Sequence, residues 1–317
     1  EEEKIRAEQN DLDAERTDIE RTINSKARLK TLIKKELAAD AEEYGDERLS
    51  DIVSRDEAQA FSEKDLISTE PVTIVLSEKG WVRAAKGHEV DAAELNYRSG
   101  DGLLKAALGR SNQDVVFLDS AGKSYALASH TLPSARGQGE PLTGRLSPSA
   151  GATFVGLATG DGEERYLVAS DAGYGFVTRL ADMQTRQKAG KSLLTVPKGC
   201  AALAPVQVSQ IEERYVVSVS NEGRLLIFPL RDLPQMARGK GNKIMNIPSA
   251  RAAAREETMI DVDVLAETDL LTIYSGKRHI TLKFADLEHY RGERARRGLK
   301  LPRGFQKVDR LEVSSKQ

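Results

Sequence analysis

The sequence contains almost none of the features that build disulfide frameworks, metal sites or membrane spans. It has one cysteine, Cys200, among 317 residues, which excludes an intrachain disulfide and is typical of a reducing compartment, so we expect a cytoplasmic location. Its four histidines are scattered and no CxxC or HExxH spacing occurs, so we expect no metal site. No apolar run approaches the roughly 20 residues of a membrane-spanning helix.

Sequence signatures of catalysis are missing too. There is no GxSxG motif, and the acidic residues form no pair whose spacing suggests acid–base chemistry. The stretch DSAGKS at 119–124 lacks the GxxxxGK[ST] spacing of a phosphate loop, so we interpret it as a hairpin turn. We therefore expect no catalytic residue and no cofactor in this chain.

Charge is divided unevenly along the chain, although the net charge is only −2. Residues 1–66 contain 20 acidic and 12 basic side chains, a balance of −8, whereas the remainder contains 29 acidic and 35 basic ones, a balance of +6. Such a split is typical of a protein in which one region meets a polyanion.

Residues 1–43 contain neither glycine nor proline and carry an apolar stripe. Its first members, Ile5, Leu12 and Ile19, are seven residues apart. The pattern predicts a long helix over 1–45 with a seam like that of a coiled coil, although a helix packed on its own domain would show a similar stripe. The chain does not begin with methionine, so we expect it to be a piece of a longer protein.

After a predicted linker at 46–69, the pattern changes to short runs of β-branched residues. Five pairs of runs are joined by glycine-containing turns, the signature of a β-hairpin. The pairs are 72–84, 115–127, 166–180, 215–230 and 270–284, and their turn glycines are 42, 51, 50 and 53 residues apart. Repetition at this period indicates an array of blades. The sequence therefore predicts a mainly β fold over 70–317, a five-bladed β-pinwheel preceded by the long α-helix.

A glycine-containing basic loop follows each predicted hairpin. The loops are YRSGDG (97–102), ARGQG (135–139), KAGK (188–191), ARGKG (237–241) and ARRG (295–298). Because they recur at similar distances after the turns, we expect them at equivalent places on successive blades, with their cations along one rim. Glycine lets the backbone approach phosphate closely, and the cations supply charge, so the pattern favours a curved track for duplex DNA over ordinary solvated loops.

Two groups of residues are predicted to serve this track. The predicted phosphate contacts are Arg83, Lys86, Arg98, Lys105, Arg136, Lys188, Lys191, Arg238, Lys240, Lys243, Arg294, Arg296 and Arg297. The glycines predicted to shape the loops are Gly100, Gly102, Gly137, Gly139, Gly239 and Gly241.

Long phrases of the chain resemble one family. They are YGDER at the end of the predicted helix, PVTIVLSEKGWVRAAKGHE (71–89), TLPSARGQGEPLTG (131–144), ASDAGYGFV (169–177) and DLPQMARGKGNKI (232–244). These phrases resemble the A subunits of bacterial topoisomerase IV, the ParC family, more than the A subunits of DNA gyrase. The resemblance covers essentially the whole chain.

This resemblance implies that the helix belongs to the coiled coil at the exit gate and that the pinwheel binds and bends DNA. The full enzyme would be an ATP-dependent type IIA topoisomerase that decatenates chromosomes and relaxes supercoils in the cytoplasm, at the nucleoid. Its partners would be the ParE subunits of the enzyme and a second ParC chain, with Mg²⁺ and ATP bound elsewhere. Its active-site tyrosine would precede Glu1, so none of the eight tyrosines here takes that role.

One stretch departs from the gyrase pattern. The A subunits of gyrase carry a box of Gln, two Arg, two Gly, Lys and Gly at the end of the first blade. The corresponding stretch here, NYRSGDG, has Asp101 at the position of the lysine, and the fourth-blade QMARGKG is closer to the box. Because an acid facing phosphate repels it, we predict capture and bending of DNA with weak wrapping.

Other classes of function remain open at this point. A protein-interaction module could use the same basic loops to dock an SMC-type condensin, which the family binds in some bacteria, or another acidic partner. A glycosidase-like propeller would need converging carboxylates, which the sequence does not indicate. A purely structural array is a further alternative.

Overall fold

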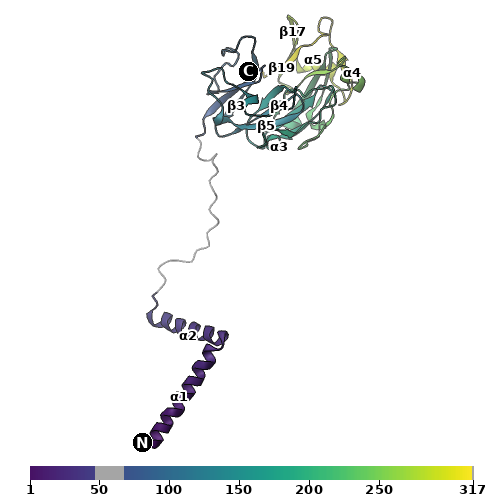
Figure 1. Cartoon of the computed structure of the whole chain (residues 1–317). Helices are drawn as coiled ribbons and strands as arrows, with labels where there is room; N and C mark the ends of the chain where they lie inside the picture. The colour runs from purple at the N-terminus through teal and green to yellow at the C-terminus, as the bar shows by residue number, and fades with distance from the viewer. Residues whose placement is uncertain (47–67, 316–317) are drawn as a thin grey trace. The chain divides into compact units, whose positions relative to one another are not determined.

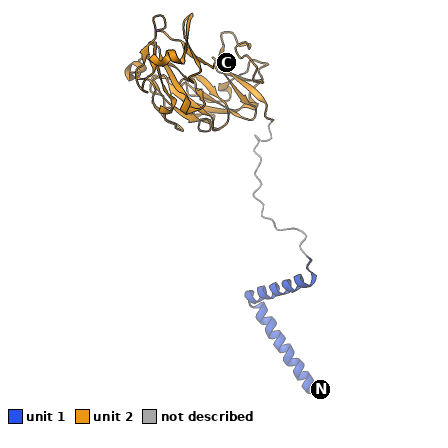
Figure 2. Cartoon of the chain, turned by 180° about the vertical axis from the view of Figure 1, so that it is seen from behind, with its two compact units in different colours: residues 1–60 blue, residues 61–317 orange. Residues whose placement is uncertain are grey.

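The computed structural model describes residues 1–46 and 68–315, and the chain divides into two compact units, residues 1–60 and 61–317 (Figure 1, Figure 2). The first unit is helical and the second is built mainly of strands. Most of the predicted linker over 46–69 lies outside the described residues, so it stays a prediction.

The first unit consists of two helices, α1 (Glu2–Ile23) and α2 (Lys26–Tyr44). The predicted long helix is therefore interrupted once. The cause is Ser25, whose backbone is extended and whose hydroxyl accepts a hydrogen bond from the backbone N–H of Arg28 at 3.4 Å, as a helix N-cap does. Neither helix contains a buried residue, so the whole apolar stripe is exposed.

The second unit contains five antiparallel sheets, which are the blades of a five-bladed propeller. The first is β3 (Leu103–Arg110), β1 (Pro71–Ser77), β2 (Trp81–Lys86) and β6 (Glu140–Pro141), in spatial order. The second is β7 (Phe154–Ala158), β4 (Asp114–Asp119), β5 (Lys123–Ala128) and β10 (Lys191–Ser192). The third is β11 (Val206–Val208), β8 (Arg165–Ser170), β9 (Tyr174–Arg179) and β14 (Asn242–Lys243).

The fourth and fifth blades complete the array. The fourth is β15 (Met259–Leu265), β12 (Tyr215–Ser220), β13 (Arg224–Pro229) and β18 (Leu299–Lys300). The fifth is β19 (Arg310–Ser314), β16 (Leu270–Ser275) and β17 (Arg278–Lys283), and it has only three strands. Every predicted hairpin is therefore present, as the two central strands of the first four blades and as β16 and β17 in the fifth.

Short helical turns link these strands. The α-helical ones are α3 (Leu180–Met183), α4 (Ser249–Ala253) and α5 (Phe284–Leu287). The 3₁₀ turns are η2 (Ser129–Thr131), η3 (Leu142–Gly144), η4 (Ile211–Glu213), η5 (Leu230–Asp232) and η6 (Glu288–Tyr290). Four turns, η2, α3, η5 and α5–η6, directly follow the hairpins of blades two to five.

The outermost strand of each four-stranded blade is formed by the segment that follows the hairpin of the next blade in the sequence. After the second hairpin the chain crosses back and supplies β6 to the first blade, and β10, β14 and β18 are supplied in the same way. The connection that follows β2 is different, because β3 begins directly after Gly102. This connection, 87–102, forms no such strand, and β17 has no partner on its outer edge among the described residues.

The apolar core is divided among the junctions between blades. Four clusters of buried residues lie between blades one and two, two and three, three and four, and four and five. Phe117, Phe176 and Phe228 are among the fully buried side chains. The described residues form no such cluster between blade five and blade one. On the axis, β3, β7, β11, β15 and β19 contribute to a cavity of about 560 Å³, which we call the hub.

Candidate nucleic-acid interface

Four of the five basic loops lie at the outer edge of the pinwheel. The loops 135–139, 188–191, 237–241 and 295–298 each lead into the outermost strand of a blade. They occupy equivalent places on blades one to four, as their recurrence predicts. We call these four loops the rim.

A glycine with positive φ directly precedes each outermost strand. At Gly139 φ is 86°, and an added Cβ would lie 2.4 Å from the carbonyl oxygen of Val82. At Gly241 φ is 73°, and the Cβ would lie 2.2 Å from the carbonyl oxygen of Gly175. A residue with a side chain would tolerate neither this conformation nor this contact. Glycine at these positions therefore allows each loop to pack closely against its blade.

Only some of the glycines predicted to shape the loops have a positive φ. Gly100 and Gly239 also have positive φ, whereas Gly102 and Gly137 do not. Gly190 and Gly298 precede β10 and β18 with φ of 73° and 77°, and sequence reasoning missed them. Their place just before the outermost strand in each repeat was the available signal.

Backbone hydrogen bonds join the loops of neighbouring blades. The Ser147 N–H donates to the carbonyl of Lys188 at 2.8 Å. Gly239 N–H donates to the carbonyl of Leu193 at 2.9 Å, and Ala295 N–H donates to that of Ile244 at 2.9 Å. Each rim loop after the first is thus bonded to the segment that follows the loop before it, and the rim is one connected surface.

The first loop, 97–102, does not occupy an equivalent place, and the prediction that all five loops do is wrong in this respect. It leads into β3, the hub strand of blade one, and it lies beside loop 135–139 on the same blade. The Arg98 Nε donates to the Gln138 side chain at 3.2 Å. The physical reason is the short connection, because the chain turns straight into β3 instead of crossing to another blade.

Three rim cations are free to meet a ligand. Arg136, Lys188 and Arg238 are exposed, and none makes a side-chain hydrogen bond or ion pair within the described part of the chain. Their charge is therefore available for phosphate.

Two more cations are held on aromatic rings. The Arg98 guanidinium lies 3.6 Å from the centroid of Trp81, and the Lys240 ammonium lies 3.9 Å from that of Tyr174. Trp81 and Tyr174 are the first residues of β2 and β9, so the two stacks are equivalent on blades one and three. A cation–π contact orients the charge without neutralising it, so these two cations join the free set.

The remaining predicted rim cations are engaged. The Lys191 ammonium donates to the carbonyl of Asp182, and the Lys243 ammonium donates to the Asn246 side chain at 2.9 Å. Arg294 donates to the carbonyl of Lys243 at 2.8 Å. The main role of these three side chains is therefore to fix the conformation of the loops, and their charge is less available to a ligand.

Two cations of the fourth rim loop pair with acids. Arg296 forms an ion pair with Glu293 at 2.7 Å. Arg297 and Arg251 both contact one oxygen of Glu257 at 2.7 Å, and Glu257 is fully buried. Because a buried carboxylate needs its partners, Arg297 is part of the support of this loop.

Three predicted contacts lie away from the rim. Arg83 is only 3% exposed, and its guanidinium donates to the carbonyls of Asn96 and Gly137 at 2.9 and 3.0 Å, so it ties the two loops of blade one together. Lys105 lines the hub. Lys86 is exposed but forms an ion pair with Glu70 at 3.2 Å. Neither the buried guanidinium nor the hub lysine lies on the rim, so the prediction that Arg83 and Lys105 line the rim is wrong.

The Asp101 carboxylate is held by backbone N–H groups of its own loop and of the turn between β1 and β2. One carboxylate oxygen of Asp101 accepts hydrogen bonds from the backbone N–H groups of Lys79 at 3.0 Å and Gly102 at 2.9 Å. Desolvation tends to raise the pKa of Asp101, but hydrogen bonds from Ser77, Lys79 and Gly102 outweigh it and hold the pKa below its usual value. Asp101 is therefore a charged anchor of the loop.

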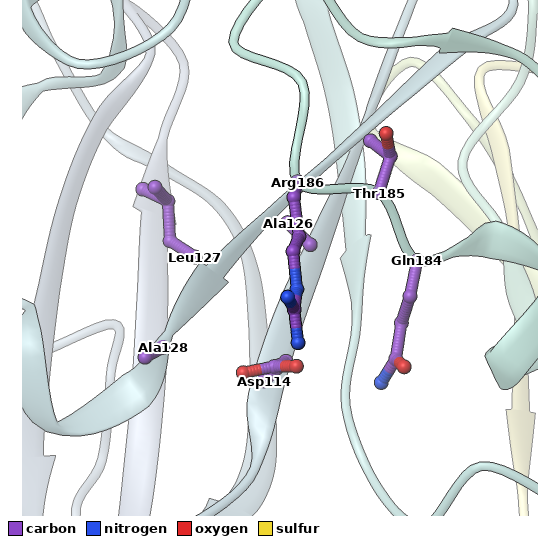
Figure 3. Close-up of a pocket in the computed structure, with 7 residues that line it drawn as sticks. All are labelled: Asp114, Ala126, Leu127, Ala128, Gln184, Thr185 and Arg186. Atoms are coloured by element: carbon purple, nitrogen blue, oxygen red, sulfur yellow. The ribbon is translucent and has the colours of Figure 1, made fainter. Parts of the chain in front are cut away.

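Blade two carries a cavity at the rim. Blades one and three have a parallel bridge from their second hairpin strand to the crossing segment, between Ala84 and Ser134 and between Val177 and Gln235. No such bridge occurs at the equivalent Ala126 in the described residues, and a cavity of about 600 Å³ lies there. Figure 3 shows Arg186, a cation that sequence reasoning missed, extending across it toward Asp114.

The described residues contain no group of histidine, cysteine and acidic side chains that could hold a metal ion. None of their helices is long and apolar enough to cross a membrane. The geometry is that of a binding surface: a connected row of glycine-shaped loops with free cations.

Comparison with known proteins identifies the family. The family model described as DNA gyrase C-terminal domain, beta-propeller, matches residues 164–209 and 214–249. The structure of the E. coli ParC C-terminal domain is 49% identical, is covered completely and covers 78% of this chain, with a TM-score of 0.69. The chain belongs to the ParC family, the A subunits of topoisomerase IV.

Sequences of this ParC family align along nearly the whole chain. The A subunit of DNA topoisomerase 4 from Pseudomonas aeruginosa is 55% identical over 99% of the chain, and that of E. coli K12 is 49% identical over 99%. The chain spans 42% of the length of each of these relatives. A DNA gyrase A C-terminal domain, 15% identical with a TM-score of 0.58, shares the fold.

Proposed function

We propose that the pinwheel binds duplex DNA along the rim through its phosphates. The observation that carries the proposal is the connected row of four loops with the available cations Arg136, Lys188, Arg238 and Lys240. Arg98, on the loop beside the first of them, adds a fifth available cation. Such charges at a glycine-shaped backbone suit phosphate oxygens and contain no base-reading element, so binding is independent of sequence. Trp81 and Tyr174 are already occupied by cations, which argues against stacking of single-stranded bases.

The bound duplex is bent and only weakly wrapped. The rim covers blades one to four, so a duplex that follows it must curve around the outer edge. Blade five has no equivalent loop, and Asp101 replaces a cation on blade one, so the charge needed for a full wrap is missing. DNA sequence then affects binding only through the stiffness of the duplex, which sets the free-energy cost of bending it.

In the full-length protein this domain positions the transported DNA segment for ATP-dependent decatenation and relaxation. The enzyme would comprise two ParC and two ParE subunits, act in the cytoplasm at the nucleoid, and bind Mg²⁺ and ATP outside this chain. The exposed stripe of α1 and α2, with Ile5 64% and Ile23 69% exposed, supports packing against the remainder of ParC in a coiled coil.

The test is binding of the full 317-residue chain to a mixed-sequence duplex as a function of salt. The variant Arg136→Ala/Arg238→Ala removes two free cations, and we expect it to lower the salt slope by about 2. The control is Lys277→Ala, an exposed lysine of blade five, which should leave the slope unchanged. Equal slopes for both variants would contradict the rim as the binding surface.

A second candidate function is docking of a protein such as an SMC-type condensin. The observation that favours it is β17, which lacks the fourth strand of the other blades and exposes Arg278, His279 and Lys283. An unpaired basic edge can accept an extended acidic segment. Replacing Thr281 on this edge by proline should abolish such docking and spare DNA binding, and loss of both would argue against a separate site.

A further inference from the structure

The junction between the first and the last blade lacks what holds the other junctions together. Each of the other four has a crossing segment and an apolar cluster. Among the described residues, no strand pairing, hydrogen bond or ion pair joins residues 71–110 to residues 266–315. The connection 87–102 instead stays on blade one, where the Arg83 guanidinium of β2 donates to the carbonyl of Asn96 at 2.9 Å.

Charged side chains of blades one and four line the hub. Lys105 on β3 of blade one lines the hub together with Asp261 and Asp263 on β15 of blade four. Asp261 and Asp263 are two residues apart on one strand and so point to the same side. Lys105 has no ion-pair partner within 4 Å among the described residues, so its charge acts across the cavity.

The acidic side of the hub is also tied to blade five. One oxygen of Asp261 accepts a hydrogen bond from the backbone N–H of Leu311 on β19 at 2.8 Å. The other cation of the hub, Arg310, is occupied, because it pairs with Glu312 at 2.9 Å and lies 3.8 Å from the ring centroid of Tyr274. Lys105 is therefore the hub cation without a direct ion-pair partner, and its charge acts on both carboxylates, whereas that of Arg310 acts on Asp261.

This arrangement is costly for the isolated domain. Burial raises the pKa of Asp263 to about 6, and that of Asp261 is also raised by burial, while the positive charge of Lys105 works against both shifts. Two neighbouring carboxylates without direct ion pairs lower stability. Groups that lower stability in this way are expected where they serve function.

We propose that Lys105, Asp261 and Asp263 are positioning residues whose attraction across the hub draws the first blade toward the fourth and fifth and so sets the curvature of the rim. The inference rests on the proposed DNA-binding function, since the rim is what the curvature shapes. When the attraction is removed, the ends of the array separate, the rim opens, and a bound duplex is bent less.

The first experiment measures the distance between the end blades without DNA. Dyes or spin labels are attached through Glu89→Cys on blade one and Lys277→Cys on blade five, both exposed sites, in a Cys200→Ser background. We expect Lys105→Glu to lengthen the distance and Lys105→Glu/Asp263→Lys to restore it. The matched control is Lys86→Glu, the same charge reversal on blade one outside the hub, which should leave the distance unchanged.

The second experiment measures the bend of a bound duplex by energy transfer between its ends. Lys105→Glu should reduce the bend while its affinity at low salt stays within about twofold of the parent, because Lys105 is not on the rim. Asp263→Asn should reduce the bend and yet raise the melting temperature, an outcome that a merely structural residue would not produce.

Two results would overturn the inference. One is an unchanged label distance in Lys105→Glu, and the other is failure of the double variant to restore the distance. Failure of the DNA-binding proposal can be told apart from failure of this inference. In the first case the parent chain would not bind the duplex, while the label distances could still be compared.

Discussion

At the scale of single residues, the neighbours of a cation decide its role. Arg136 is exposed without a side-chain partner, whereas Arg83 is 3% exposed and bonded to two loop carbonyls. The sequence does not reveal this difference, since both are arginines of the predicted β-pinwheel and both were predicted to contact phosphate. The connection 87–102 brings Asn96 to Arg83, and the segment that crosses back from blade two brings Gly137, and no local pattern encodes either contact.

This contrast predicts opposite effects of two alanine substitutions. Arg83→Ala leaves two carbonyls and a cavity in the interior, so it should lower the free energy of unfolding by about 2–4 kcal/mol in urea titrations. Arg136→Ala should change it by less than about 0.5 kcal/mol and should instead lower the DNA-binding salt slope by about 1. A stable Arg83→Ala protein would show that the guanidinium does not hold the two loops.

The raised pKa of Asp263 predicts how stability depends on pH. Its folded-state pKa of about 6 lies above the roughly 3.9 of an unfolded chain, so the protonated form favours folding. The resulting stabilisation is complete below about pH 4 and is lost as the pH rises through about 6. As the pH falls from 7.5 to 5.5, we expect the melting temperature of the parent to rise relative to that of Asp263→Asn. Parallel curves would contradict the shift.

At the scale of elements, glycine fixes the rim loops. Gly241→Ala combines a φ of 73° with a Cβ 2.2 Å from a carbonyl oxygen, so it should lower the free energy of unfolding by about 2 kcal/mol or more and weaken DNA binding. Gly137→Ala is the matched control, because φ is not positive there and the nearest atom would lie 3.9 Å away. Similar losses in the two variants would show that loop flexibility, and not this contact, is what matters.

The elements were predictable where the signal was local. Each hairpin was evident because β-branched runs and a turn glycine lie within about 15 residues. The two-residue outer strands were not, because β6 pairs with β2 across about 58 intervening residues and has no periodicity of its own. The break at Ser25 did have a signal, since Asn and Ser before a helical run often mark an N-cap, but the continuing apolar stripe hid it.

At the scale of the whole molecule, the strand exchange between blades explains both the order and the limits of the rim. Each exchanged strand carries a basic loop to the outer edge, so the four exchanges give four equivalent loops. The recurrence of the loops was visible in the sequence, but their assignment to blades was not, because it depends on which neighbour each strand pairs with. The same pattern explains why β17 has no partner on its outer edge among the described residues, because no strand is exchanged at the junction of blades five and one.

The central claim is that the rim binds duplex DNA through its phosphates, and the most direct test is the salt dependence of binding to two duplexes of unrelated sequence. With about five available cations, we expect a slope of log K against log salt near −4 to −5 and affinities that agree within about threefold. A slope near zero, or a preference of more than about tenfold for one sequence, would contradict it.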